Sequence, residues 1–295
     1  MPARLRLLWP LLLGVLYALT FAEGQLPGWA LPWTQVFALS LLAHWVFTAQ
    51  TIKHAASVGF AFGVAAFASG LYWLIISMHV YGGMALPLAW LALLLFAAYL
   101  ALFPALAALM AAWLLRPISS TRPWVLLWKA SIWAAAWCGS ELLRGSLFTG
   151  FPWLTTAYGQ TDGWLAGWSV AVGAPGTTWV TAWISGAVAA TLAAHAGQHA
   201  ASFTPKRGIA LALAIVLAFL GALLQQSHFT QASGEPLVVR LVQGNVDQGM
   251  KFDPVLFANA HTHHINLAKH QQTPPSTKAP ATPDLVLMPE TVIAR

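Results

Sequence analysis

The sequence predicts an α-helical membrane bundle of about seven transmembrane helices, followed by the start of an α/β domain. Of its 295 residues, 58% are hydrophobic and only 7% are charged, whereas a typical soluble domain is about 25% charged. The charges are also unevenly spread, with twelve in residues 1–230 and ten in residues 231–295. We therefore predict a transmembrane helical domain in 1–230 and a second domain that begins in 231–295.

Seven apolar stretches are long enough to be membrane spans, since a helix needs roughly 20 apolar residues to cross the hydrocarbon core. The first of them has the composition of a signal peptide, but the six that follow favour an uncleaved helix. The fourth contains Pro104, which removes a backbone donor and predicts a tilt or a kink. The predicted spans are 7–22, 29–47, 55–78, 84–114, 123–143, 167–194 and 208–226.

Lysine and arginine predict the orientation of these spans. Only Arg144 lies in the connections on one side, whereas the alternate connections hold Arg4, Arg6, Lys53, Arg116, Arg122, Lys206 and Arg207. Cytoplasmic loops carry this excess, so we predict a cytoplasmic N-terminus and, after an odd number of spans, a periplasmic second domain. The net charge of +6 is explained by this orientation, and no nucleic-acid partner is expected.

The sequence of the second domain predicts a strand, then a helix, then another strand. A β-branched run, LVVRLVQGN, occupies 237–245, a weak helical face follows Asp253-Pro254, and the apolar run DLVLMPE begins at Asp284. This order favours a parallel pair in an α/β layer. Glu290 then lies at the carboxyl end of a strand, where functional groups gather, and a partly buried carboxylate there can act as a general base. The alternative is a solvated strand end.

The connection 144–166 is long, aromatic and almost uncharged. Its Phe151, Pro152 and Trp153 form a rigid apolar turn on the same side as Glu290, suited to lie in the membrane interface and guide an acyl chain. An interfacial anchor is the alternative. Just before it, Glu141 and Arg144 have i,i+3 spacing, which predicts an ion pair at the end of a span.

The sequence predicts no metal site and no cofactor. His261, His263, His264 and His270 are close together, but no cysteine or carboxylate lies at ligand spacing, so a solvated helix face is favoured. The single cysteine, Cys138, lies in an apolar run and is expected to be a small buried hydrophobic residue.

Three stretches together resemble one family, the apolipoprotein N-acyltransferases. ELLRGSLFTGFPWLTTAYGQTDG (141–163) is similar to the family's periplasmic loop after the fifth helix. LVQGNVDQGMKFDP (241–254) is similar to the start of its nitrilase-like domain, and LVLMPET (285–291) to its first catalytic motif. The three occur in the family's order.

The resemblance implies a helical bundle in the bacterial inner membrane. The bundle would carry a nitrilase-like α/β/β/α sandwich on its periplasmic side. It implies acyl transfer from a phospholipid, typically phosphatidylethanolamine, to the N-terminal amine of a diacylglyceryl-cysteine lipoprotein, through a cysteine thioester. Glu290 would be the general base of a Glu-Lys-Cys triad. Trp153 matches a family aromatic near the substrate entrance, and Phe252 stands where the family often has tryptophan.

In the family, the triad lysine and cysteine follow the Pro-Glu motif, and residues 291–295 contain neither. Cys138 lies within a predicted span, where desolvation opposes thiolate formation. We therefore expect the chain as given to be truncated and without catalytic activity. The alternative is a non-catalytic membrane scaffold or lipid-binding protein derived from the family.

Overall fold

The computed structural model describes residues 8–22, 27–117, 122–196, 208–227, 230–246, 254–269 and 282–289. The chain divides into two compact units, Met1–Phe229 and Thr230–Arg295. Each unit is described by itself.

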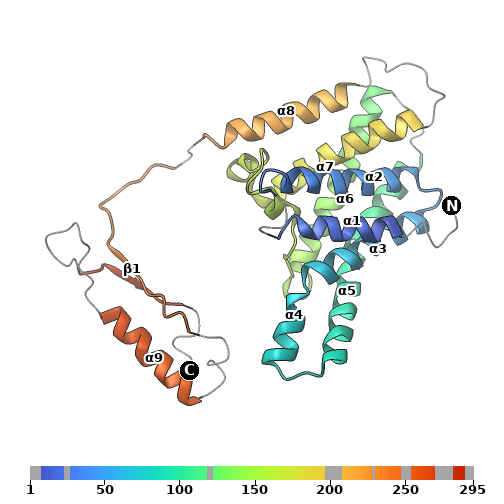
Figure 1. Ribbon diagram of the computed structural model, residues 1–295. Coiled ribbons are helices and arrows are strands. Elements are labelled where there is room, and N and C mark those ends of the chain that lie inside the picture. Colours follow the sequence, from blue (N-terminus) through green and yellow to red (C-terminus); the bar gives the residue numbers. More distant parts are fainter. Residues whose placement is uncertain are drawn as a thin grey trace. The chain divides into compact units, whose positions relative to one another are not determined.

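The first unit is a bundle of helices (Figure 1). Prolines stand in the first turn of α2, α5 and α6, where a missing N–H costs no intrahelical bond. In chain order the elements are α1 (Leu8–Leu19), α2 (Leu31–Thr48), α3 (Ile52–Gly70), α4 (Trp73–Ile76), the π-helical turn η2 (Ser77–Tyr81), α5 (Leu86–Leu115), α6 (Pro123–Ser146), the 3-10 turns η3 (Leu147–Thr149) and η4 (Thr156–Gln160), α7 (Gly167–Ala196) and α8 (Gly208–Leu224).

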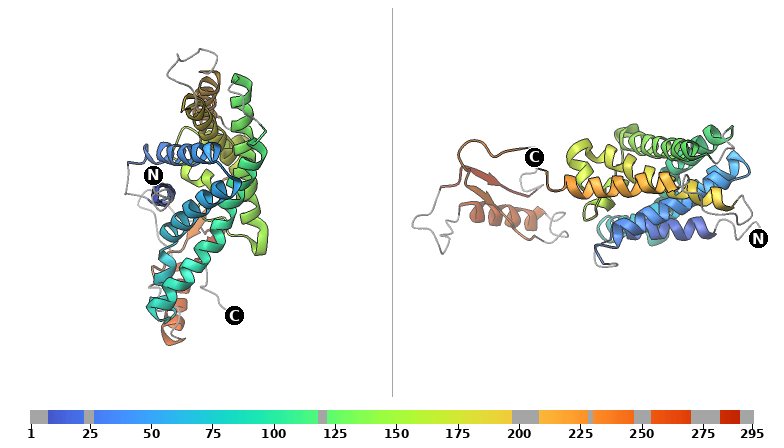
Figure 2. Two further views of the ribbon diagram at one scale, coloured as in Figure 1. Left: turned by 90° about the vertical axis from the view of Figure 1, so that its right-hand side faces the viewer. Right: turned by 90° about the horizontal axis from the view of Figure 1, so that it is seen from above.

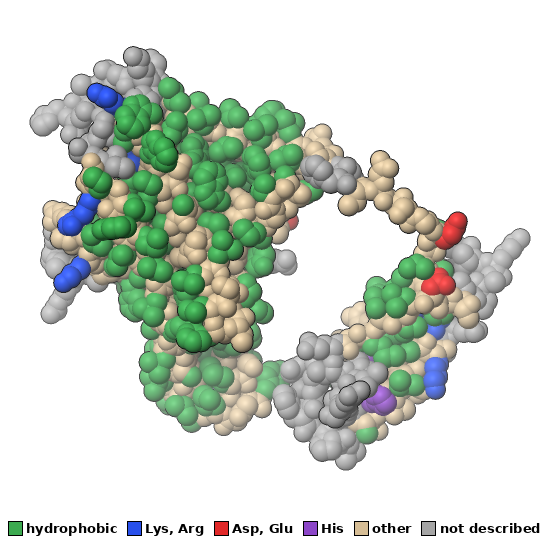
Figure 3. Space-filling view, turned by 180° about the vertical axis from the view of Figure 1, so that it is seen from behind, with side chains coloured by type: hydrophobic (Ala, Val, Ile, Leu, Met, Phe, Trp, Pro, Cys, Tyr) green, Lys and Arg blue, Asp and Glu red, His purple; other side chains and the backbone are tan. Residues whose placement is uncertain are grey.

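Among the described residues, 4 helices are long and apolar enough to cross a membrane: Gly28–Thr48, Ile52–Gly70, Leu86–Leu115 and Gly167–Ala194. The apolar helices α1 and α8 are shorter. On the face seen in Figure 3, hydrophobic side chains cover much of the helical unit, and Lys and Arg side chains gather at one end of it. These features agree with a helical membrane region, and the count of seven spans stays a prediction.

Small residues allow the helices to approach closely. In Figures 1 and 2, α3 and α5 lie side by side. A Cβ added at Gly59 of α3 would lie 2.5 Å from the carbonyl oxygen of Pro104 in α5. A Cβ at Gly14 of α1 would lie 2.2 Å from the carbonyl oxygen of Phe62 in α3. Helices in lipid associate through this kind of close backbone packing, because burial of apolar surface from lipid gives little driving force.

The predicted third span, 55–78, is not one helix. It is divided into α3, which ends at Gly70, and the short α4, which begins at Trp73. Leu154, from the connection between α6 and α7, lies at the break, where a Cβ on Gly70 would be 2.5 Å from its Cδ1. The break is therefore associated with a side chain far along the sequence.

The second unit contains β1 (Val239–Leu241), α9 (Pro254–Lys269) and β2 (Leu285–Leu287). The strands are parallel, with Val239 opposite Leu285, which confirms the predicted parallel pair. The amide of Val242 donates to the carbonyl oxygen of Leu287 at 2.9 Å, and the Arg240 guanidinium donates to the carbonyl oxygen of Ala268 in α9.

Candidate functional site

The structure describes some of the predicted site residues and not others. Phe151, Pro152 and Trp153 lie between η3 and η4, within the described residues. Glu290 and Phe252 lie outside them. The site that can be built from the structure is therefore the connection between α6 and α7, which we call the α6–α7 loop.

The α6–α7 loop has an unusual backbone. Phe148, Thr149 and Leu154 have φ of 50°, 73° and 57°, a left-handed region that side chains with a Cβ seldom adopt. At Gly150, φ is 81° and a Cβ would lie 1.9 Å from the carbonyl oxygen of Gly145, so only glycine fits. Such conformations persist only when the surrounding structure fixes them.

Four aromatic rings converge on the loop, and we call them the aromatic ledge: Trp73, Phe96, Phe151 and Trp153. Phe151 and Trp153 are stacked, with ring centroids 5.3 Å apart and planes 21° apart. Phe151 meets Phe96 of α5 edge-on at 5.0 Å, and Trp153 lies 6.4 Å from Trp73 of α4. Trp153 remains 50% exposed. The ledge therefore exposes apolar ring surface and is packed against α4 and α5.

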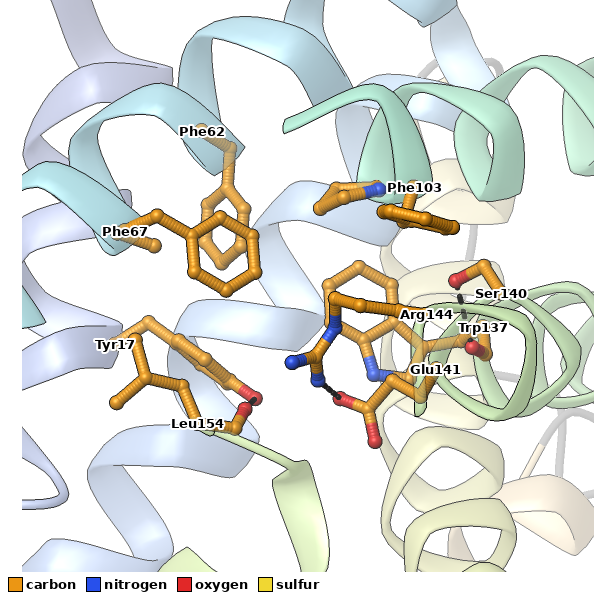
Figure 4. Close-up of a pocket in the computed structure, with 11 residues that line it drawn as sticks. Tyr17, Phe62, Phe67, Phe103, Trp137, Ser140, Glu141, Arg144 and Leu154 are labelled. Carbon is orange, nitrogen blue, oxygen red and sulfur yellow. Dashed lines mark hydrogen bonds and ion pairs between the residues drawn. The ribbon is translucent and has the colours of Figure 1, made fainter. Parts of the chain in front are cut away.

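Beneath the loop lies a group of buried polar side chains that we call the polar node: Tyr17, Glu141, Arg144, Thr156 and Thr178. In Figure 4, the Glu141 and Arg144 side chains point toward each other, beside Tyr17 and Leu154. Arg144 Nη2 lies 4.0 Å from Glu141 Oε1, which confirms the predicted pair, and the residues are 3% and 9% exposed. Buried charges are stable only when they are paired and hydrogen-bonded.

Glu141 receives its hydrogen bonds from two parts of the chain. The amide of Thr156 lies 3.1 Å from Oε1 and 3.2 Å from Oε2, and the Thr156 hydroxyl donates to Oε1 at 2.8 Å. The Thr178 hydroxyl of α7 donates to Oε2 at 3.2 Å. Each of these partners is a donor, as an ionised carboxylate requires.

Arg144 is bonded to the backbone that carries the ledge. Its Nη1 donates to the carbonyl oxygen of Phe151 at 2.6 Å and to that of Trp153. Its Nη2 lies 3.4 Å from Thr155 Oγ1, and its Cζ lies 5.3 Å from the ring centroid of Phe67. The polar node therefore holds both sides of the ledge's turn.

Tyr17 ties α1 to the same loop. Its hydroxyl donates to the carbonyl oxygen of Leu154 at 3.1 Å and lies 2.9 Å from Thr156 Oγ1. Trp137 Nε1 donates to that same Thr156 oxygen at 2.9 Å. Sequence reasoning missed Tyr17, Thr156 and Thr178, and the one available indication was that these polar groups stand in or beside apolar spans.

Next to the polar node, a groove of about 340 Å³ lies between α6, α7 and the loop. Helix α7 is broken at Gly173, which has φ 67° and ψ −176°, and Pro175 follows. Pro175 also lines the groove, so the break borders it. The volume of the groove falls in the range of ligand pockets, roughly 300–1,000 Å³. Residues that line it include Cys138, Leu142, Gly145, Pro152, Pro175 and Thr178. Cys138 is buried, as predicted, and its Sγ lies 3.4 Å from the carbonyl oxygen of Pro175.

The polar node, the α6–α7 loop and helices α2 to α6 all fall in one stretch that matches a known family model. Residues 13–187 match the apolipoprotein N-acyltransferase N-terminal domain. The chain belongs to the apolipoprotein N-acyltransferase family. The resemblance seen in the sequence is thereby confirmed, and the family is one of acyltransferases.

Relatives in this family cover the second unit as well. The chain is 40% identical over 284 residues to the apolipoprotein N-acyltransferase of Bordetella bronchiseptica, which is 95% of this chain and 50% of that protein. It is 42% identical over 252 residues to that of Ralstonia nicotianae, covering 85% of this chain and 45% of the relative. The chain thus spans about half the length of the curated relatives that it matches.

Proposed function

We propose that the protein acts as an apolipoprotein N-acyltransferase in the bacterial inner membrane. It would transfer an acyl chain from a phospholipid such as phosphatidylethanolamine to the N-terminal amine of a diacylglyceryl-cysteine lipoprotein, the last step of lipoprotein maturation. Membership of the family carries this proposal, supported by relatives of the same name. The N-terminus would be cytoplasmic and the second unit periplasmic, which fits the gathering of Lys and Arg at one end of the helical unit (Figure 3).

The α6–α7 loop is the proposed contact for the lipid substrates. Trp153 is half exposed and stacked on Phe151, so its ring offers a fixed apolar surface to an acyl chain. Pro152 lies between them in the sequence and lines the groove. Because this turn is already rigid, little further entropy is lost in ordering it when a substrate binds.

The chemistry is proposed for residues that the structure does not describe. Glu290 would take the proton of a cysteine thiol, and the thiolate would attack the ester carbonyl of the phospholipid. A thioester forms and the lysophospholipid alcohol leaves with a proton. The lipoprotein amine then attacks the thioester, Glu290 takes its proton, and the thiol is released. A lysine would stabilise the oxyanion at each tetrahedral stage, and Phe252 would lie near the substrate.

The proposed triad needs a lysine and a cysteine placed after Glu290, and residues 291–295 hold neither. We propose that residues 231–295 belong to the N-terminal part of a nitrilase-like domain, a proposal supported by relatives of which this chain covers about half. Acyl transfer is proposed for a protein that carries both residues after Glu290.

The loop's role is tested by photocrosslinking in lipid nanodiscs that contain phosphatidylethanolamine with a diazirine on one acyl chain. We expect crosslinks on the peptide 145–160 and a loss of about tenfold in Trp153→Ala, because one aromatic anchor dominates such contacts. Trp164→Ala is the matched control, since Trp164 is 54% exposed, packs on Trp33 and lies outside the aromatic ledge. Equal crosslinking in the wild type and in Trp153→Ala would contradict the proposal.

Acyl transfer itself is measured on a protein that carries the proposed lysine and cysteine after Glu290, with phosphatidylethanolamine and a diacylated lipopeptide as substrates. Turnover that falls in Trp153→Ala supports the proposed enzyme. Lipid binding without turnover, in a product that carries the lysine and the cysteine, would favour a non-catalytic membrane scaffold.

A further inference from the structure

We propose that Arg144 is the positioning residue that sets the aromatic ledge for its lipid substrate, an inference that rests on the proposed role of the α6–α7 loop. Arg144 is 3% exposed, so it is not placed to contact lipid itself. It would act through the backbone of Phe151 and Trp153; the partly buried Phe151 ring stacks on the Trp153 ring, which is half exposed.

The first support is where the hydrogen bonds of Arg144 go. Its Nη1 donates to the carbonyl oxygens of Phe151 and Trp153, the two residues whose rings stack. Its own carbonyl oxygen accepts from the amide of Phe151 at 2.9 Å. Phe151 is thereby held through both its N–H and its C=O by one residue of α6, which fixes the direction of its side chain.

The second support is that the loop depends on outside contacts for its shape. Positive φ angles at Phe148, Thr149 and Leu154 have an intrinsic cost. The carbonyl oxygen of Leu154 accepts from Tyr17, and the amide of Thr156 donates to Glu141. Polar-node residues therefore hold the backbone at Phe151, Trp153, Leu154 and Thr156.

The third support is that the site uses the planar shape of a guanidinium. Nη1 serves two carbonyl oxygens, Nη2 faces Glu141 and Thr155, and Cζ lies near the Phe67 ring. A lysine ammonium is a single point of charge and lacks this fork. We therefore expect lysine to restore the charge but only part of the loop's geometry.

The experiment that tests this compares Arg144→Met with the wild type in phosphatidylethanolamine nanodiscs, by hydrogen exchange with mass spectrometry. Positioning predicts that the peptide 147–158 exchanges about tenfold faster in Arg144→Met, because the loop opens locally. Peptides from α3 and α5 that do not contain Phe67 or Phe96 should be unchanged, because these two rings are the contacts of α3 and α5 with Arg144 and Phe151 described above. Arg144→Lys should lie between the wild type and Arg144→Met.

A second pair of variants covers the case in which Arg144→Met fails to fold. Thr178→Val removes a hydroxyl that donates to Glu141 and accepts from the amide of Ala157 at 3.3 Å. Thr181→Val is its matched control, one turn along α7, since the Thr181 hydroxyl donates to Thr177 within the same helix. We expect faster loop exchange in Thr178→Val than in Thr181→Val.

The same variants are then crosslinked with the diazirine phosphatidylethanolamine. We expect the loop crosslink to fall at least about fivefold in Arg144→Met and to recover in part in Arg144→Lys, as for a displaced binding anchor. Uniformly faster exchange across the bundle in Arg144→Met, with no difference between Thr178→Val and Thr181→Val, would overturn the inference. So would exchange and crosslinking that stay at wild-type values in Arg144→Met. If the wild type gives no loop crosslink but Arg144→Met still frees the loop, the lipid-contact role fails and the control of the loop by Arg144 stands.

Discussion

Each of the two units uses a carboxylate to hold a backbone amide, and the surroundings of the two differ. In the helical unit, Glu141 accepts from the amide of Thr156 at 3.1 Å and is 9% exposed. In the second unit, Asp284 accepts from the amide of Val238 at 2.8 Å and is exposed. Water competes for the second bond and not for the first. Burial, more than bond length, should therefore decide how much each carboxylate matters.

The apolar side chains of the two units also differ in how far they are buried. In the helical unit, Trp133, Phe62 and Leu39 are almost fully buried. In the strand pair, Leu241 is 74% exposed, and Leu285 is 44% exposed. Parallel strands are normally covered on both faces, and the described residues leave much of this pair's apolar surface open. The helical unit is therefore the part in which single contacts should have large effects.

The largest expected effect comes from Glu141→Leu. This change removes the partner of a buried Arg144 and leaves the amide of Thr156 without its acceptor. Removing one member of a buried pair costs about 3–5 kcal/mol. We expect that loss in the free energy of unfolding, measured by thermal unfolding of the chain in detergent micelles.

Glu141→Gln separates charge from hydrogen bonding, because it keeps one acceptor oxygen and nearly the same volume. It should lose less stability than Glu141→Leu. Unfolding temperatures within error of the wild type for both variants would show that the polar node does not stabilise the helical unit.

A smaller effect is expected when a close helix contact is disturbed. Gly59→Ala places a methyl group 2.5 Å from the Pro104 carbonyl oxygen, and such overpacking costs about 1–3 kcal/mol. Gly139→Ala is the control, because nothing lies within 4 Å of an added Cβ there, and it should gain about 0.5–1 kcal/mol from helix propensity. The two unfolding temperatures in micelles should shift in opposite directions. A shift in the same direction would contradict the close contact between α3 and α5.

Local patterns predicted much of this architecture. The i,i+3 spacing of Glu141 and Arg144 predicted their ion pair, because one helical turn brings such residues together. The order strand, helix, strand predicted the parallel pairing of β1 and β2. The apolar stretches predicted the long helices, since length and composition alone suffice for that.

Contacts between distant parts of the chain were not predictable. Tyr17 meets Thr156 across 139 positions, and Thr178 meets Glu141 across 37. A hydroxyl in an apolar span leaves no periodic pattern, because its partner is chosen by tertiary packing. The break after Gly70 was missed for the same reason, since the Leu154 side chain that lies against it comes from another part of the chain.

The smallest effect is expected from Asp284→Ala, the exposed counterpart of Glu141→Leu. It removes the acceptor of the Val238 amide but leaves the ladder bond from the Asp284 amide to the Val238 carbonyl oxygen at 2.9 Å. Water can replace an exposed acceptor, so the local loss should be about 0.5 kcal/mol. Hydrogen exchange of the Val238 amide should rise about twofold, while the unfolding temperature of the helical unit stays unchanged. An effect on that temperature as large as that of Glu141→Leu would show that burial does not separate the two carboxylates.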